Sequence, residues 1–210
     1  MLEITLNQVS KKIKNNWVLK NISYTFQGGT LYGIYGYNGS GKTMLLRMIS
    51  GLIRPTEGSV FINDKKLHAE IDYPESIGVL IESPNFWKNY TGFEVLKTLA
   101  AIKKVISDDE IKNAMKRVLL DPEDKRTISK YSLGMKQKLG IAQAIMEHPD
   151  IILLDEPTNA LDKKSVTQVR QILLEEKKRG AIVIIASHNS QDIDLCDQMI
   201  EVTEGMIENA

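Results

Sequence analysis

The sequence lacks the features that would place the chain itself in a membrane. No apolar run approaches the ~20 residues that a bilayer-spanning helix needs, and the first residues lack the apolar stretch of a signal peptide. Cysteine is nearly absent: Cys196 is the only one among 210 residues, so no internal disulfide can form. We expect a cytosolic protein with Cys196 as a small core residue, and any work at a membrane would need another chain.

The formal net charge of the chain is zero. The 27 Lys and Arg residues balance 27 Asp and Glu residues, which argues against a nucleic-acid-binding platform. Basic residues stop at Arg179, whereas acidic residues crowd the last part of the chain: Asp192, Asp194, Asp197, Glu201, Glu204 and Glu208. We expect these acids to form a solvated acidic face.

The length allows one domain with a sizeable core, and the patterning divides it into parts. Residues 1–82 and 149–210 are expected to form a catalytic core, in which the N-terminal runs alternate as antiparallel strands do. Residues 83–130 turn helical, with a capping box at Ser107 and Glu110, and residues 131–137 lead back to the core. After Pro149, apolar strands alternate with a helix over 163–178, which predicts an α/β fold with a parallel sheet.

A glycine-rich run lies between a strand pattern at 30–35 and a helix pattern at 44–49. It fits the phosphate-binding motif G-x-x-x-x-G-K-[ST] at every fixed position and consists of Gly36, Tyr37, Asn38, Gly39, Ser40, Gly41, Lys42 and Thr43. Glycines let backbone N–H groups point at a phosphate, and the helix N-terminus adds partial positive charge. We predict that the chain binds a nucleoside triphosphate, with Lys42 on the outer phosphates and the Thr43 hydroxyl on Mg²⁺.

Two acids end a second apolar strand at 151–154. Asp155 and Glu156 would emerge beside the phosphates, because ligands bind beyond the carboxyl ends of parallel strands. Asp155 is placed to hold Mg²⁺, directly or through its water, and Glu156 to polarise a water that attacks the γ-phosphate. Acids at a strand end can instead cap the following turn, but the phosphate loop favours the catalytic interpretation. The pair favours hydrolysis over phosphoryl transfer to a substrate.

A third run, residues 130–137, precedes a helical pattern. Ser132 is a good helix N-cap, so its hydroxyl and free backbone N–H groups would make a second anion site. Here the chain resembles the nucleotide-binding subunit of an ABC transporter, whose consensus at this place is Leu-Ser-Gly-Gly-Gln. The sequence keeps Ser132 and Gly134 and departs from the consensus at Tyr131, Leu133 and Met135.

The other landmarks of that family follow in its order. Residues 159–162 resemble its D-loop, and His188, after an apolar strand at 181–186, resembles the histidine that contacts the γ-phosphate. The resemblance implies a RecA-like P-loop NTPase core with a parallel sheet, an N-terminal antiparallel β subdomain and an inserted α-helical subdomain. It implies ATP and Mg²⁺ as ligands. The catalytic residues and metal ligands would include Lys42, Glu156, His188, Thr43 and Asp155.

Two positions depart from the family pattern. Glu82, after the strand at 77–81, stands where most members carry glutamine and would bring a carboxylate near Mg²⁺ and the γ-phosphate. A glutamate here resembles transporters of lantibiotics, bacitracin or similar peptides, or multidrug exporters. The alternative is a neutral exchange, since either oxygen can meet a metal. Ile13 replaces the aromatic residue that usually stacks on adenine, and Trp17 is the nearby candidate, unless it packs under the sheet.

The resemblance implies two partners. Ser132 and Gly134 would lie too far from the phosphate loop of their own chain, so each ATP would be held between Lys42 of one copy and Ser132 of a second. An integral membrane permease would dock at the aromatic-rich residues 85–90, although such aromatics are as often buried. The protein would then lie on the inner face of the cell membrane through its permease, and no nucleic acid is expected.

We therefore predict an ATP-hydrolysing subunit that powers transport through a separate membrane protein, with peptide export or immunity favoured. A soluble ATPase of the same superfamily is the alternative. It is disfavoured because the chain has neither a second cassette nor long coiled-coil insertions. A P-loop kinase is disfavoured by Glu156 and by the run around Ser132.

Overall fold

The strands form two sheets in this computed structural model, which describes residues 2–208. A four-stranded antiparallel sheet has the order β2-β1-β4-β5. Its strands are β1 (Glu3–Ile13), β2 (Asn16–Gln27), β4 (Glu57–Ile62) and β5 (Lys65–Lys66). A six-stranded sheet has the order β10-β9-β3-β8-β7-β6 and is parallel except for β10. Its strands are β3 (Thr30–Tyr35), β6 (Ile77–Leu80), β7 (Ile151–Asp155), β8 (Ile182–Ala186), β9 (Gln198–Thr203) and β10 (Met206–Glu208).

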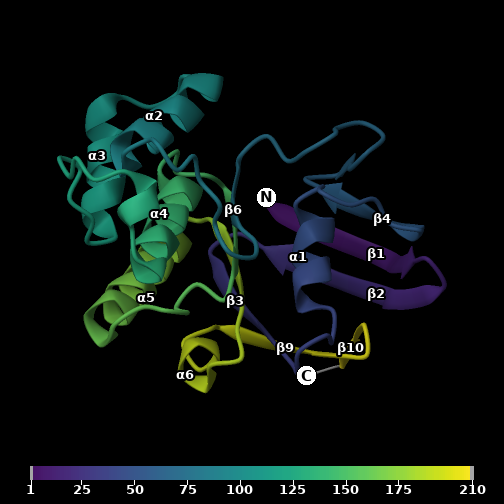
Figure 1. Cartoon of the computed structure of the whole chain (residues 1–210). Coiled ribbons are helices and arrows are strands. Elements are labelled where there is room, and N and C mark those ends of the chain that lie inside the picture. The colour runs from purple at the N-terminus through teal and green to yellow at the C-terminus, as the bar shows by residue number, and fades with distance from the viewer. Residues whose placement is uncertain (1, 209–210) are drawn as a thin grey trace.

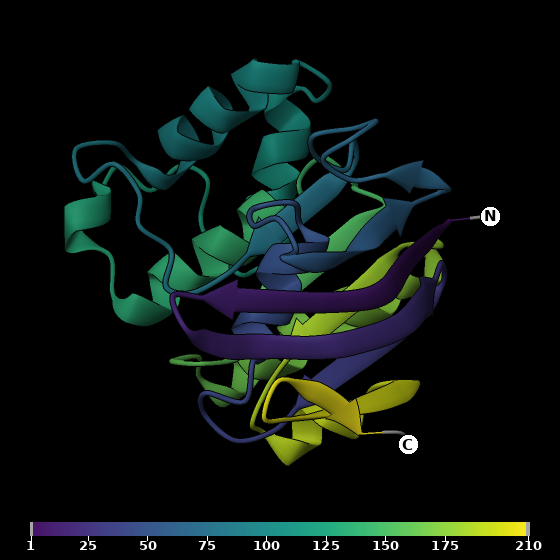
Figure 2. The ribbon, with the colours of Figure 1, turned by 90° about the vertical axis from the view of Figure 1, so that its right-hand side faces the viewer.

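Helices cover the six-stranded sheet and build a separate helical part. They are α1 (Lys42–Ile49), α2 (Gly92–Lys103), α3 (Asp108–Arg117), α4 (Leu133–Ile145), α5 (Lys163–Lys178) and α6 (Ser190–Ile193). Figure 1 shows α2 and α3 at one end of the molecule and the antiparallel strands at the other, with the six-stranded sheet between them. Figure 2 shows the long strands β1 and β2 running side by side across the molecule. This arrangement confirms the predicted fold class.

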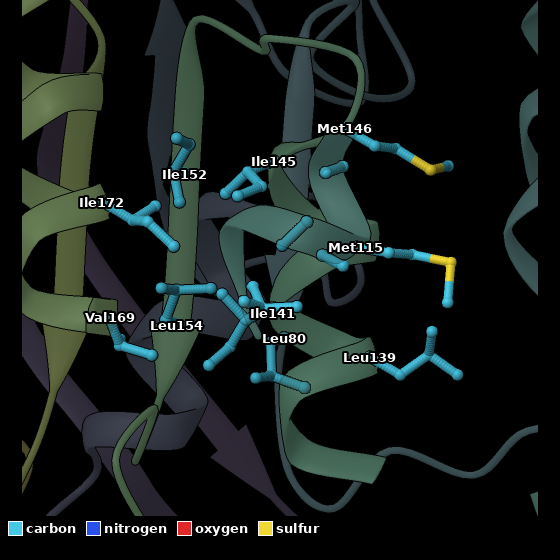
Figure 3. Close-up of a cluster of buried hydrophobic side chains, with 14 of the residues drawn as sticks. Leu80, Met115, Leu139, Ile141, Ile145, Met146, Ile152, Leu154, Val169 and Ile172 are labelled. Carbon is cyan, nitrogen blue, oxygen red and sulfur yellow. The ribbon is translucent and has the colours of Figure 1, made fainter. Parts of the chain in front are cut away.

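Both faces of the central strands of the six-stranded sheet are buried, which explains why β7 and β8 are apolar at nearly every position. Side chains alternate along a strand, so Ile152 and Leu154 pack with α4 and α5, whereas Ile151 and Leu153 pack with α1 and the antiparallel sheet. Figure 3 shows the first of these two clusters, with β7 between side chains of α4 and α5. The sheet is therefore held from two sides, and the ends of its strands are fixed in position.

The helical part begins each of its two helices with a capping box. Ser107 and Glu110 cap α3 as predicted, and Thr91 and Glu94 cap α2 in the same way. In both boxes the hydroxyl accepts from a backbone N–H group and the glutamate accepts from the backbone of the capping residue, so two free donors are satisfied. The 3₁₀ turn Ile128–Lys130 then leads into α4.

The acidic end of the chain differs from the expectation. Asp192 is 1% exposed and pairs with Arg170 of α5, so the prediction of a solvated face is wrong there. The carboxylate of Asp197 likewise accepts from Lys177 and from the backbone of Leu31. The basic partners come from an earlier helix that the charge pattern along the chain does not reveal. Cys196 is partly buried, and burial raises the pKa of its thiol to about 12.

Two further features were not predicted. The short helix α6 follows β8, and β9 and β10 form an antiparallel hairpin at the edge of the six-stranded sheet. Within residues 2–208, none of the helices combines the length and the apolar character that a bilayer span requires.

Candidate active site

The glycine-rich loop between β3 and α1 adopts a backbone that only glycine accepts easily. Gly36 has φ 146°, and Gly41, the N-cap of α1, has φ 116°. A Cβ atom on Gly36 would lie 2.2 Å from the carbonyl oxygen of Val202. The loop is therefore curled tightly between the end of β3 and the start of α1, with its N–H groups at the N-terminus of that helix.

Two polar groups of the loop have bonding capacity left for an anion. Lys42 is 7% exposed, and its ammonium donates to the carbonyl oxygens of Gly36 and Tyr37, at 2.7 Å and 3.1 Å. An ammonium has three donors, so a third remains. The Ser40 hydroxyl is buried and has no hydrogen-bond partner among the residues that the structure describes. Phosphate oxygens would satisfy both groups, so the loop fits this ligand.

The end of β7 meets the start of α1 through one short hydrogen bond. The Thr43 hydroxyl donates to Oδ2 of Asp155 at 2.6 Å. Asp155 is 8% exposed, and burial raises the pKa of its carboxyl above the ordinary value, although the hydrogen bond from Thr43 acts in the opposite direction. A hydroxyl and a buried carboxylate oxygen are ligands that a hard divalent cation prefers, and bound positive charge would favour the ionised Asp155.

Glu156, the next residue, is held by its backbone and faces His188. It adopts the left-handed conformation, with φ 49°, and its N–H donates to the Ala186 carbonyl at 2.8 Å. The Gln137 side chain of α4 donates to the Glu156 carbonyl at 2.9 Å and to that of Pro157 at 3.2 Å. These bonds leave the carboxylate free, and its Oε1 lies 2.7 Å from Nδ1 of His188.

The loop and the two acids line one open hollow of about 270 Å³. Its lining consists of Val18, Asn38, Gly39, Gly41, Lys42, Thr43, Met44, Asp155 and Glu156. Trp17 does not line the hollow, although it neighbours Val18 on β2. Its ring is 39% exposed, with the Lys12 ammonium 5.4 Å from the ring centroid, so it does not pack under the sheet.

Ser132 and Gly134 lie outside this hollow. Ser132 caps α4 as predicted and accepts from the backbone N–H of Met135 at 3.2 Å. A Cβ atom on Gly134 would come within 2.7 Å of the Ala160 carbonyl oxygen, so the start of α4 touches the run that follows Glu156. In one chain, the hollow is therefore lined by residues of the phosphate loop and by the two acids, but not by Ser132.

Glu82 follows β6 and pairs with a cation that the sequence analysis did not consider. Its Oε1 lies 2.7 Å from Nη2 of Arg47 on α1, and the Glu82 side chain is 61% exposed. Its negative charge is one of the minor influences that raise the pKa of Asp155. Among residues 2–208, no group of three or more His, Cys, Asp and Glu side chains is arranged to hold a metal ion. The candidate metal ligands are instead one carboxylate and one hydroxyl, those of Asp155 and Thr43.

Gln137 was missed as a site residue. It is 7% exposed and lies on the same face of α4 as the buried Ile141 and Ile145, one and two turns further along. A polar side chain on an otherwise apolar helix face is a signal that could have identified it, because buried amides need partners.

Comparison with known proteins agrees with this geometry. The sequence profile described as ABC transporter matches residues 19–159 of the chain. The chain belongs to the ABC transporter family. It is an ATP-binding subunit, an ATPase that powers transport.

Individual relatives span nearly all of this ABC ATPase. An uncharacterized ABC transporter ATP-binding protein of Bacillus subtilis, YybJ, is 54% identical over 211 residues, covering 100% of this chain and 96% of YybJ. The bacitracin transport ATP-binding protein BcrA of Enterococcus faecalis is 35% identical over 202 residues, covering 95% of this chain and 65% of BcrA.

A solved dimeric structure of MJ0796, a bacterial ABC transporter cassette, matches with a TM-score of 0.88 at 27% identity, covering 98% of this chain and 97% of that one. A dimeric post-hydrolysis state of the same cassette, bound to ADP and Pi, gives a TM-score of 0.87 at 25% identity over the same shares of the two chains.

Replacing Lys42 by alanine tests the phosphate loop of this ABC ATPase. We expect Lys42→Ala to weaken ATP binding at least about tenfold, because a hydrogen bond to a charged group contributes about 1.5–3 kcal/mol, and to abolish turnover. Calorimetry gives the affinity and phosphate release gives the rate. Lys116→Ala, on an exposed lysine of α3, is the control and should change neither. Unchanged hydrolysis by Lys42→Ala would contradict the assignment of the loop.

Proposed function

We propose that the chain hydrolyses Mg²⁺-bound ATP between two of its copies and thereby drives a separate permease that exports a peptide antibiotic or confers immunity to one. The contact of Glu156 with His188, beside the Thr43–Asp155 hydrogen bond, is the observation that carries the hydrolytic part. The part concerning the cargo is supported by Glu82 and by the similarity to a bacitracin transport protein.

The residues of the hollow divide the chemistry between them. Lys42 donates its remaining N–H to the outer phosphates, and Thr43 and Asp155 would hold Mg²⁺, which when bound neutralises phosphate charge. Glu156 accepts the proton of the attacking water as a general base, since its carboxylate is 23% exposed at the edge of the hollow. His188 holds the Glu156 carboxylate through the contact of its Nδ1 with Oε1, and the rest of its exposed ring faces the space that the γ-phosphate would enter.

A second copy would complete the site. Ser132 lies outside the hollow of its own chain, and Leu133 next to it is 62% exposed, which is unusual for a leucine at the start of a largely buried helix. An exposed apolar side chain beside a free helix N-terminus suits a face that closes on a partner's nucleotide. The dimeric state of the similar cassette MJ0796 supports the same arrangement. The D-loop-like run 159–162 would lie in the same seam, since Ala160 touches Gly134.

Glu156→Gln separates binding from hydrolysis. The amide keeps the size and removes the base, so hydrolysis should fall about 100-fold or more, while ATP still binds and holds the two copies together. Size-exclusion chromatography with ATP and Mg²⁺ should then show a dimer for Glu156→Gln and a monomer for Lys42→Ala. If Glu156→Gln stays monomeric at saturating ATP, the proposed sandwich is wrong.

An exposed pair of aromatic side chains supports the docking of a permease. Trp87 is 50% exposed and Tyr90 is 43% exposed, and their ring centroids lie 5.7 Å apart. The loop that carries them is fixed from beneath: Ile128 donates its backbone N–H to the Tyr90 carbonyl, and Ser129 donates to that of Lys88. Exposed aromatics on a fixed loop are preferred anchors of protein interfaces. Docking there would hold the chain at the inner face of the cell membrane.

Trp87→Ala tests this docking loop. Loss of a buried aromatic anchor should weaken association with the membrane subunit by about 2 kcal/mol, roughly 30-fold in affinity, while basal ATPase activity stays unchanged. The measurement is a pull-down of the permease, titrated with the purified ATPase. Tyr73→Ala, which removes a 61% exposed aromatic elsewhere, is the matched control. Full association of Trp87→Ala would contradict the proposal, and failure of the unmodified chain to bind any membrane subunit would favour a soluble ATPase.

Glu82 precedes the docking loop by a few residues in the sequence. Its carboxylate pairs with Arg47 of α1, the helix whose first residues line the hollow. We expect Glu82→Ala to leave basal ATPase activity within about threefold but to remove the peptide resistance that the complex gives to cells. Glu82→Gln should be milder, because an amide oxygen can still meet Mg²⁺ or its water. Growth at graded peptide concentrations measures the phenotype. Undiminished resistance with Glu82→Ala would make the glutamate a neutral exchange.

A further inference from the structure

A buried carboxylate beyond His188 has no role in the site described so far. Asp192 of α6 is 1% exposed and accepts four hydrogen bonds. They come from Thr158 Oγ1 at 2.5 Å, Arg170 Nε at 2.8 Å, Arg170 Nη2 at 2.6 Å and Ser187 Oγ at 3.4 Å. A charge persists in a protein interior only where it is paired and hydrogen-bonded, and Asp192 is both.

The two oxygens of Asp192 have different partners. Both bonds from Arg170 reach Oδ1, so the guanidinium fixes the carboxylate from the side of α5. Both hydroxyls, of Thr158 and Ser187, reach Oδ2. Oδ1 therefore fixes the carboxylate to α5, and Oδ2 contacts hydroxyl groups from two different segments.

Each of these hydroxyl groups stands next to a catalytic candidate. Thr158 follows Glu156 by two residues, and Ser187 directly precedes His188. The Ser187 hydroxyl lies 3.4 Å from Oδ2 of Asp192 and 3.5 Å from Oε2 of Glu156, and its single proton can be donated to only one of them at a time. It therefore stands between the two carboxylates, beside the Glu156 oxygen that does not contact His188. Asp192 thus ties the segment after β7 to the segment after β8, at the place where their ends carry Glu156 and His188.

Backbone hydrogen bonds hold the start of both segments, from Glu156 to Ala186 at 2.8 Å and from Ser187 to Ile34 at 3.0 Å, and Asp192 adds a tie between the two segments beyond these bonds. Glu156 adopts a left-handed backbone, which costs a non-glycine residue conformational energy and persists only where its surroundings fix it. His188 lies beyond the last residue of β8, with 62% of its side chain exposed. A side chain this exposed keeps a fixed position only if its backbone is fixed.

We propose that Asp192, locked by Arg170, is a positioning residue for ATP hydrolysis: by holding Thr158 and Ser187 it sets the distance between Glu156 and His188. The inference rests on the proposed roles of those two residues. A purely structural buried ion pair is the competing explanation. A structural ion pair needs only the bonds from Arg170. It does not explain why hydroxyl groups of two segments, Thr158 after β7 and Ser187 after β8, both lie at Oδ2 of Asp192.

Asp192→Asn keeps the shape of the side chain and removes its charge, leaving one carbonyl oxygen for donors that need two. We expect kcat to fall about 10- to 100-fold, the loss that a misplacement of about 1 Å produces. KM and the dissociation constant for ATP should stay within about twofold, because the phosphate loop and Thr43 are untouched. Asp194→Asn, on the exposed acid two residues further on, is the matched control and should keep both constants.

A second variant separates positioning from stability. Asp192→Asn combined with Arg170→Met removes both charges, so no unpaired guanidinium is left in the interior and the melting temperature should recover towards that of the unmodified chain. If Asp192 positions the catalytic residues, kcat should remain low in this double variant. If Asp192 only forms a structural ion pair, kcat should recover together with the melting temperature. Recovery of kcat would overturn the proposal, as would a folded Asp192→Asn variant with unchanged kcat.

Two controls keep the result clear. If Asp192→Asn does not fold, Thr158→Val removes the shorter hydroxyl bond to Oδ2 without leaving a charge unpaired and without touching Ser187, which also lies near Glu156, and a fall in kcat is again expected. An unchanged kcat in that variant would equally contradict the proposal. Glu156→Gln tests the site itself: if it hydrolyses ATP normally, the proposed function fails, whereas its inactivity beside a fully active Asp192→Asn variant would refute the positioning role alone.

Discussion

The register of three parallel strands is the constraint on which the site depends. Ala186 of β8 pairs with Ile34 of β3 on one side and with Asp155 of β7 on the other. The three strands therefore end at one level, and the phosphate loop, the acid pair and His188 emerge together at one edge of the sheet. Apolar clusters on both faces fix this register, because a slip of one residue would exchange the side chains fitted against α4 and α5 for those fitted against α1, and a close-packed interior does not accommodate such an exchange.

Beyond the strand ends, hydrogen bonds from polar side chains of helices, rather than strand pairing, hold the loops in position. Gln137 of α4 holds the carbonyls of Glu156 and Pro157, and Arg170 of α5 fixes Asp192. Gln137 and Asp192 are buried, so each of their hydrogen bonds is worth more than it would be in water and each missing partner would cost more. The helices that cover one face of the sheet thus also orient its loops. This explains why polar residues occur on helix faces that are otherwise apolar.

The same construction leaves other parts of the molecule free for partners. The start of α4 presents Ser132 and Leu133 outward, and the loop before α2 presents Trp87 and Tyr90. Backbone hydrogen bonds join that loop to residues 128–129, only a few positions before Ser132. A permease that moved the loop would therefore act on the segment that leads to the face for the second copy. In the proposed function, this short connection couples ATP hydrolysis to transport.

The sequence by itself determined the features that depend on neighbouring residues. The phosphate loop, the strands β3 and β7, the helix α5 and the Ser132 cap could all be predicted, because glycine conformation, side-chain periodicity and capping act over a few positions. The family resemblance added the order of the landmarks and the candidate roles of Glu156 and His188.

Only the tertiary structure decided which distant groups meet. It buried Asp192 against Arg170, paired Glu82 with Arg47, brought Gln137 to Glu156 and added the hairpin of β9 and β10 to the sheet. A carboxylate has the same letter in the sequence whether it is solvated or buried. The helices and strands that surround it come from distant parts of the chain, so no local sequence pattern predicts them.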